Sequence, residues 1–185
     1  LFPPSITDAY SYSIANQIYE GLLKFDQEYL TLENALAESY TVDSTGTTYT
    51  FKIKKGIFFQ DADCFPNGKG REVTTADIKY CFTALCKSRG NNHGFEIFQG
   101  LLKGADSYYS ASKDEKEPPF EIEGIKIIDD YTIQFQLLKK SSLFLYSLAR
   151  PFAYIYPKEA FEKYGMEMRI KPVGTGPFYL STVDE

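Results

Sequence analysis

The side chains that could perform chemistry are few and scattered. The only histidine is His93, and it lies in a Gly/Asn-rich stretch where an exposed loop residue is expected. A nucleophile needs a base beside it, and a histidine-rich metal site needs more than one imidazole. The sequence contains no G-x-S-x-G or H-E-x-x-H pattern and no phosphate-binding glycine loop. We therefore predict no catalytic residue, no metal site and no cofactor.

The three cysteines, Cys64, Cys81 and Cys86, are better explained as packing residues than as reactive groups. An odd number does not suggest a disulfide framework. Cys81 and Cys86 are five residues apart in a helical pattern, so they lie on different faces of the helix. Because Cys behaves as a small apolar residue, buried free thiols are expected. Carboxylate pairs lie in predicted turns, where Asp supports the backbone geometry, for example Asp61 with Asp63 and Asp129 with Asp130.

Aromatic residues are abundant, with fifteen Tyr and fifteen Phe but no Trp. Most of them are expected to fill the core, and we assign to it Phe58, Phe59, Phe82 and Phe135. Other aromatics flank turns or the ends of elements. These could line a cleft, because an aromatic ring offers a large apolar area and Tyr adds a polar tip. The residues of this second kind are Tyr10, Tyr12, Phe95 and Phe152.

Length and composition define the class of protein. The 185 residues are enough for one domain or slightly more, and 43% apolar with 24% charged residues is typical of a globular chain. The net charge is −5, which argues against a nucleic-acid partner because such a partner requires a basic face. No apolar run is long enough to span a membrane. Residues 101–130 carry eight acids and four lysines, which we interpret as a solvated surface.

Two segments have clear helical signatures. Residues 5–8 have the spacing of a capping box, so a helix is predicted to begin near Asp8 and to end at Gly21. A second helix is predicted after Thr74, whose capping box is completed by Asp77. Its buried face is expected at Ile78, Cys81, Phe82 and Leu85. Further helical stretches are expected at residues 95–109, 143–149 and 157–165.

Strands are indicated by alternating apolar and polar residues. This pattern predicts a strand at residues 49–53 and a hairpin over 125–137 that turns at Asp129-Asp130. Shorter extended segments are expected at residues 22–25, 57–59 and 152–156, and after the turn at 174–178. Helices and hairpin-type strands interleave along the chain. The predicted class is therefore α/β, with a mixed or mainly antiparallel sheet and flanking helices.

Six motifs, in order along the chain, resemble those of a known family. They are IANQIYEGLLKFD at 14–26, LAESY at 36–40, TTYTFKIKKGIFF at 47–59, TTADIKY at 74–80, IIDDYTI at 127–133 and GTGPF at 174–178. Together they resemble family 5 of the bacterial extracellular solute-binding proteins, the oligopeptide- and dipeptide-binding receptors of ABC importers. Two places differ from the family pattern: a longer loop follows Gln60, and Leu1-Phe2-Pro3 stands where the family has L-D-P.

The resemblance implies a partial fold of the periplasmic binding protein type II kind. Family members are longer than 185 residues, so the sequence is expected to be a fragment. By motif position, residues 17–165 would form a smaller contiguous domain. Residues 1–16 and 166–185 would be two strips of a discontinuous domain. The opposing domain that closes on the ligand would lie outside this sequence.

The resemblance also implies a function without catalysis. A family member binds a peptide, or a similar extended solute, by hinge closure and delivers it to the permease subunits of an ABC importer. The expected location is periplasmic or otherwise extracytoplasmic. Association with the membrane would occur only through the permease or through a lipid anchor that this sequence does not contain. An export signal is also missing from these 185 residues.

Two other functions remain open at this stage. A secreted hydrolase domain with carboxylate chemistry would need two acids that converge in a pocket and have perturbed pKa values. A non-catalytic interaction module would expose a large apolar patch.

The resemblance places candidate ligand-binding residues in two segments. In the family, the segment before the first helix runs along the ligand, which corresponds here to Thr7, Asp8 and Ala9. For Thr7 and Asp8, helix capping is an alternative explanation. The loop after the second helix also approaches the cleft, which adds His93, Gly94 and Phe95.

Overall fold

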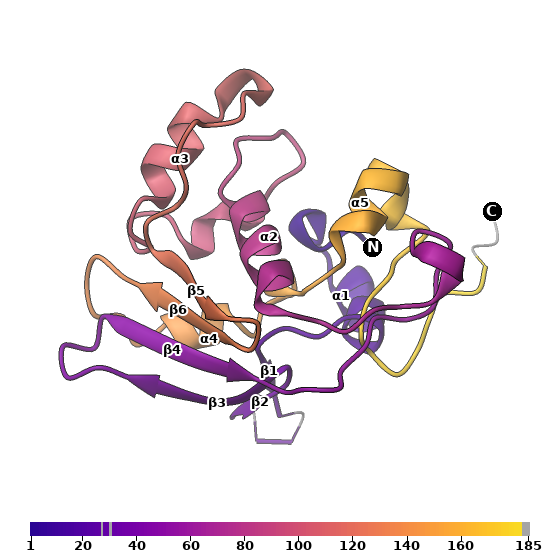
Figure 1. Cartoon of the computed structure of the whole chain (residues 1–185), viewed down its shortest axis with the longest axis horizontal. Coiled ribbons are helices and arrows are strands. Elements are labelled where there is room, and N and C mark those ends of the chain that lie inside the picture. Colours follow the sequence, from indigo (N-terminus) through magenta and orange to yellow (C-terminus); the bar gives the residue numbers. More distant parts are fainter. Residues whose placement is uncertain (27, 30, 183–185) are drawn as a thin grey trace.

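The chain folds around a four-stranded antiparallel sheet with strand order β3-β4-β6-β5, as seen in a computed structural model that describes residues 1–26, 28–29 and 31–182 (Figure 1). The strands are β3 (Ala37–Val42), β4 (Thr48–Ile53), β5 (Ile125–Asp129) and β6 (Thr132–Gln136). A separate two-stranded ribbon pairs β1 (Leu23–Phe25) with β2 (Leu32–Asn34). All strand pairs in the described residues are antiparallel, so the predicted α/β class with an antiparallel sheet is confirmed.

Five α-helices accompany the sheet within the described residues. They are α1 (Ala9–Ile18), α2 (Thr75–Leu85), α3 (Ala105–Ala111), α4 (Phe144–Ser147) and α5 (Lys158–Tyr164). Figure 1 shows α2 and α3 on the same side of the sheet and α5 farther along, towards the N-terminus. None of these helices is long and apolar enough to cross a membrane.

The core is built on the inward face of β4 and β6. Along β4 the buried residues alternate with polar ones, and β6 repeats the pattern. Phe135 lies at the centre of this face: its ring centroid is 5.7 Å from Phe51, 5.4 Å from Phe82 on α2 and 6.0 Å from Phe144 on α4. Such contacts between rings add to the free energy gained by burying them. Phe135 therefore joins the sheet to two helices.

Helix α1 begins where the sequence predicts but ends earlier. Asp8 is its N-cap, and Tyr19 is already extended, so the predicted end at Gly21 is wrong. A Cβ on Gly21 would lie 2.9 Å from the carbonyl oxygen of Leu148. The glycine is therefore needed for a close approach between backbone segments, which sequence spacing does not distinguish from a helix cap.

Helix α2 confirms its sequence signature. Thr74 and Asp77 form the capping box, and the backbone N–H of Thr74 donates to Asp77 Oδ2 at 2.9 Å. The four residues predicted for its inner face are each at most 1% exposed: Ile78, Cys81, Phe82 and Leu85. Cys81 and Cys86 are buried free thiols, as predicted. Cys64 is only partly buried, and this burial raises the pKa of its thiol to about 11.

Several short elements differ from the sequence expectation. The stretch 95–109 is not one helix: a 3-10 turn at Gly94–Ile97 is separated from α3 by glycines with positive φ, Gly100 and Gly104. Residues 57–59 form only a single bridge, and Phe58 is 56% exposed, so its assignment to the core is wrong. Residues 152–156 belong to a 3-10 turn (Pro151–Ala153) and an extended segment rather than a strand.

The remaining predictions concern the hairpin, two short helices and the strand after the 174–178 turn. The β5–β6 hairpin turns at Asp129-Asp130, and α4 and α5 lie within the two short stretches expected to be helical. After the 174–178 turn, no strand occurs in the residues that the structure describes. Sequence patterning missed β2 and β3 as strands, because five of the six residues of β3 are exposed.

One tyrosine hydroxyl is sealed in the interior. Tyr19 is 1% exposed, and its hydroxyl has no hydrogen-bond partner among the described residues. Its ring stacks with that of Tyr154, with the centroids 6.3 Å apart. Burial raises the pKa of Tyr19 far above its ordinary value.

A cluster of charges around Arg71 connects the loop before α2 to both α2 and α5. The guanidinium donates to both carboxylate oxygens of Asp77, at 2.7 and 2.9 Å, and to both oxygens of Glu159, also at 2.7 and 2.9 Å. It also lies 5.4 Å from the ring centroid of Phe59. The Asp77 side chain is 3% exposed, so this carboxylate depends on Arg71 for its counter-charge.

We expect Arg71→Met to destabilise the fold by about 2–3 kcal/mol, because it leaves the Asp77 carboxylate buried without a cation. Urea unfolding at pH 7 measures the change. The matched control is Lys69→Met, which removes an exposed ion pair with Asp61 and should cost less than about 1 kcal/mol. Equal losses in the two variants would contradict a special role for Arg71.

The same cluster predicts a pH dependence. Hydrogen bonds from Arg71 hold the pKa of Glu159 below its ordinary 4.5. The folded state therefore binds this proton less tightly than the unfolded state, so the stabilisation is present above pH 4.5 and is lost as pH falls through the lowered pKa. Glu159→Gln should reduce the dependence of the free energy of unfolding on pH in this acid range. The change should be less than about 1 kcal/mol, because the Glu159 carboxylate is partly exposed. The control Glu162→Gln, also on α5 but in an exposed pair, should leave the profile unchanged.

Candidate ligand-facing surface

The segment before α1 is exposed, and helix capping sets its conformation. Thr7, Asp8 and Ala9 all face solvent. The backbone N–H of Ser11 donates to Asp8 Oδ1 at 2.8 Å, and hydrogen bonds of this kind lower the pKa of the Asp8 carboxyl. Capping by Asp8 is therefore present in the fold. Thr7 forms no side-chain hydrogen bond with the described residues, and its role in ligand binding stays a prediction.

The loop after α2 is fastened to this N-terminal segment. The N–H of His93 donates to the carbonyl of Pro4 at 2.9 Å, while the His93 side chain is exposed. Asn92 fixes the loop from the other side: its Nδ2 donates to the carbonyls of Leu85 and Lys87 at 2.8 and 2.7 Å. Sequence reasoning missed Asn92, although an Asn shortly after a helix is a recognised capping signal.

Gly94 and Phe95 pack beneath the His93 loop, in the core, and do not lie on the exposed surface of the loop. Both are buried, and the ring of Phe95 stacks on that of Tyr109 with 4.0 Å between the centroids. A Cβ on Gly94 would lie 2.7 Å from Leu85 Cδ2 and 2.8 Å from Phe152 Cβ. The structure thus brings His93 beside the N-terminal segment and places the next two residues in the core.

Of the four aromatics considered for a cleft, Tyr12 lines a pocket. Tyr12 lies on the wall of an open pocket of about 330 Å³ between α1, the β1–β2 ribbon and the C-terminal tail. Tyr10 is 86% exposed on the surface of α1, whereas Phe95 and Phe152 are buried. The predicted cleft role therefore fits the position of Tyr12 and does not fit Phe95 or Phe152.

The acids on the wall of this open pocket have separate partners. Glu20 accepts a hydrogen bond from Thr175 Oγ1 at 2.8 Å, and Glu33 lies 3.6 Å from the ammonium of Lys24. Asp26 accepts from two backbone N–H groups of the turn that follows it. A carboxylate-dependent hydrolase needs two acids that converge on one reacting group. Among the described residues, Glu20, Glu33 and Asp26 have no hydrogen-bond or ion-pair partner in common.

The C-terminal tail crosses the end of α1 at very close range. The N–H groups of Gly176 and Phe178 donate to the carbonyls of Ile18 and Gln17, at 2.8 and 3.1 Å. A Cβ on Gly174 would lie only 2.1 Å from the Ile18 oxygen, so only glycine fits there. Gln60 holds the tail from the opposite side, donating to the Gly176 carbonyl at 2.8 Å. The G-T-G-P-F motif is thus a backbone crossing, and no phosphate-binding role is needed to explain it.

A family model for bacterial extracellular solute-binding proteins, family 5, matches residues 31–185, which is most of the chain. The chain belongs to this family. The predicted resemblance is therefore confirmed, and the matched region of this family-5 chain contains the sheet, α2 and the tail crossing.

Curated relatives align over almost the whole family-5 chain. A glutathione-binding protein, GsiB, from Escherichia coli O1:K1 is 35% identical over 182 residues, which are 98% of this chain and 30% of the relative. GsiB from Salmonella choleraesuis is 31% identical over the same length. The chain thus spans about a third of the length of the curated relatives that it matches.

Solved structures show the same fold. The periplasmic binding protein DppA from Helicobacter pylori, in complex with the peptide STSA, is 26% identical with a TM-score of 0.76, covering 99% of this chain and 34% of that one. An oligopeptide-binding protein (OppAIV) from Borrelia burgdorferi has a TM-score of 0.83 at 23% identity, covering 98% of this chain and 34% of that one. The type II periplasmic binding protein fold is confirmed, and the chain corresponds to about a third of it.

We expect Gly94→Ala to destabilise the fold by about 1–3 kcal/mol, because the added methyl group overlaps Leu85 and Phe152. The matched control is Gly90→Ala in the same loop, where a Cβ meets nothing within 4 Å and φ is not positive. Chemical denaturation measures both. A Gly94→Ala variant as stable as the control would show that Gly94 is not a packing residue.

Proposed function

We propose that this chain forms one wall of the substrate-binding component of an ABC importer that takes up peptides or similar extended solutes. The observation that carries the proposal is the family-5 match over residues 31–185. The names of its relatives support the ligand class: one is a glutathione-binding protein, and DppA is in complex with a peptide. The receptor binds its solute by hinge closure and delivers it to the permease subunits.

The proposed domain arrangement follows the motif positions. Residues 17–165 form the smaller contiguous domain, and residues 1–16 and 166–185 are two strips of a discontinuous one; the last three of these residues lie outside the described part of the chain. One contact supports the pairing of the strips: the Leu1 ammonium donates to the carbonyl of Arg169. The tail also bonds to Gln17 and Ile18, at the start of the contiguous domain.

The ligand-facing residues of this wall are Thr7, Asp8, Ala9 and His93. Their exposure and the hydrogen bond between His93 and Pro4 support a continuous surface. Gly94 and Phe95, which are buried, contribute by fixing the position of the His93 loop. The exposed backbone around Ala9 is suited to an extended peptide, because such a ligand is recognised largely through main-chain hydrogen bonds.

The working compartment is outside the cytoplasmic membrane. The family description, extracellular solute-binding proteins, supports this location. Burial of Cys81 and Cys86 is compatible with it, because buried thiols are inert towards oxidation. Tethering would come from a lipid anchor or from the permease.

The proposal predicts that Ala9→Trp in the complete receptor weakens peptide binding at least about tenfold, because the bulky side chain obstructs the surface where the ligand lies. Calorimetric titration with a pool of di- to pentapeptides measures the affinity. The control is Ala76→Trp, at an exposed position on α2, which should bind like the parent receptor. Unchanged affinity in Ala9→Trp would remove this segment from the site.

The same titration of the 185-residue chain alone should give no signal. Pockets of this kind bury most of the ligand surface, and one wall cannot do so. Micromolar binding by the chain alone would contradict the one-wall proposal. A complete receptor that binds none of these peptides would overturn the proposed ligand class.

A further inference from the structure

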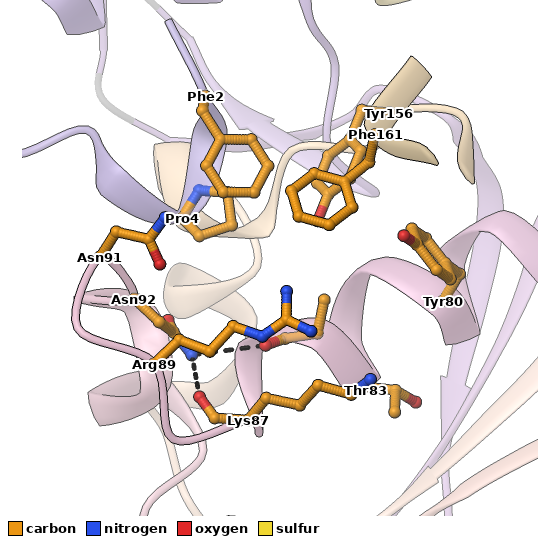
Figure 2. Close-up of a pocket in the computed structure, with 11 residues that line it drawn as sticks. Phe2, Pro4, Tyr80, Thr83, Lys87, Arg89, Asn91, Asn92, Tyr156 and Phe161 are labelled. Atoms are coloured by element: carbon orange, nitrogen blue, oxygen red, sulfur yellow. Dashed lines mark hydrogen bonds between the residues drawn. The ribbon is translucent and has the colours of Figure 1, made fainter. Parts of the chain in front are cut away.

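A second pocket lies on the side of the chain where the N-terminus meets α2 and α5 (Figure 2). Its volume is about 60 Å³, and its walls come from Phe2 and Pro4, from α2, from the loop 87–92 and from α5. None of the proposed ligand-facing residues lines it, and it does not overlap the open pocket beside α1.

One wall of this pocket is aromatic. The rings of Phe2 and Phe161 are stacked, with centroids 5.3 Å apart, and Tyr156 meets Phe2 edge-on at 5.4 Å. Tyr80 packs edge-on against Tyr156 at 6.1 Å. These contacts fix the orientation of the four rings, so the apolar wall exists before any ligand arrives.

The facing wall is cationic. Figure 2 shows the side chain of Arg89 reaching across the pocket below these rings, and its guanidinium lies 5.7 Å from the ring centroid of Phe161. Arg89 is partly buried, and within the described residues its side chain forms neither a hydrogen bond nor an ion pair. The neighbouring Lys87, in contrast, is paired with Glu117. The donors of this guanidinium thus have no acceptor among the side chains and carbonyls that the structure describes.

A tyrosine hydroxyl faces the same space. Tyr156 is 1% exposed as a whole residue and lines the pocket, and its hydroxyl forms no hydrogen bond with a described residue. The charge of Arg89 acts on this group: it opposes the rise in pKa that burial causes at Tyr156 and at Tyr80. Arg89, Tyr80 and Tyr156 all line this pocket, so the guanidinium and the two tyrosines surround one small space.

We infer that this pocket binds the carboxylate group of a small ligand with a short aliphatic stem. The planar guanidinium of Arg89 presents two parallel N–H donors, which match the two oxygens of a carboxylate. The hydroxyl of Tyr156 supplies a further donor. The stem lies against the rings of Phe2 and Phe161, and the small volume limits it to a few carbon atoms.

The test uses propionate and its neutral isostere propionamide, titrated into the 185-residue chain and followed by NMR. Propionate should shift the Arg89 Nε–H and the Tyr156 ring signals together, with a Kd in the millimolar range, about 1 mM, because so small a ligand makes few contacts. Propionamide should bind at least tenfold more weakly, because it carries no charge. This experiment does not depend on the proposed peptide-binding function.

Arg89→Gln should weaken propionate binding at least tenfold. The matched control is Arg150→Gln: Arg150 also lies over a ring, 5.2 Å from the centroid of Phe152, but it is paired with Glu96 outside the pocket. The control should bind propionate like the parent chain. Tyr156→Phe keeps the ring and removes only the hydroxyl, so it should weaken binding severalfold even if Arg89→Gln does not fold.

Three results would overturn the inference. The first is unchanged propionate binding by an Arg89→Gln variant whose amide spectrum shows that it is folded. If Arg89→Gln does not fold, unchanged binding by Tyr156→Phe has the same meaning. The second is propionamide binding as tight as that of propionate. The third is tighter binding of inorganic phosphate than of propionate, which would assign the pocket to a different anion.

Discussion

The position of α2 and α5 relative to each other depends on the bonds that Arg71 makes to Asp77 and Glu159. Asp77 also accepts a hydrogen bond from the N–H of Thr74, so the start of α2 and the charge cluster share one buried carboxylate. Because α2 supplies Tyr80 and α5 supplies Phe161, the same cluster joins two of the elements that line the pocket in Figure 2. A single guanidinium thus links the helix start, the packing of two helices and a candidate site.

Sequence patterns predict the helices and strands that are determined by residues close together in the chain. Capping residues identified the starts of α1 and α2, and alternation identified β4 and the β5–β6 hairpin. Prediction failed where tertiary contacts decide. Strand β3 has almost no buried face to produce an alternating pattern, and Gly21 is required by the nearby Leu148 carbonyl rather than by a helix end. The apolar run 152–156 is buried without joining a sheet, which periodicity alone does not reveal.

The candidate sites likewise divide into residues that local sequence signals predict and residues that only tertiary contacts bring together. The segment Thr7–Ala9 could be found from the sequence, because the adjacent capping signal and family motif mark its position. Gly94 and Phe95 could not be separated from His93 by sequence, since only the folded loop shows which of them face the core. Arg89 and Tyr156 are far apart along the chain and belong to no shared motif. Their proximity arises from the packing of α2 against the segment that leads into α5, so the sequence carries no local signal for this pocket.

The buried side chains of Tyr19 and Tyr156 make the chain sensitive to alkali. Burial raises the pKa of both phenols, so each keeps its proton in the folded state, whereas in the unfolded chain it ionises near pH 10. Raising the pH above this value therefore favours unfolding in proportion to the number of such groups. Since the chain has no Trp, tyrosine dominates its near-ultraviolet spectrum. The absorbance of these two phenolates is thus an internal optical probe of unfolding.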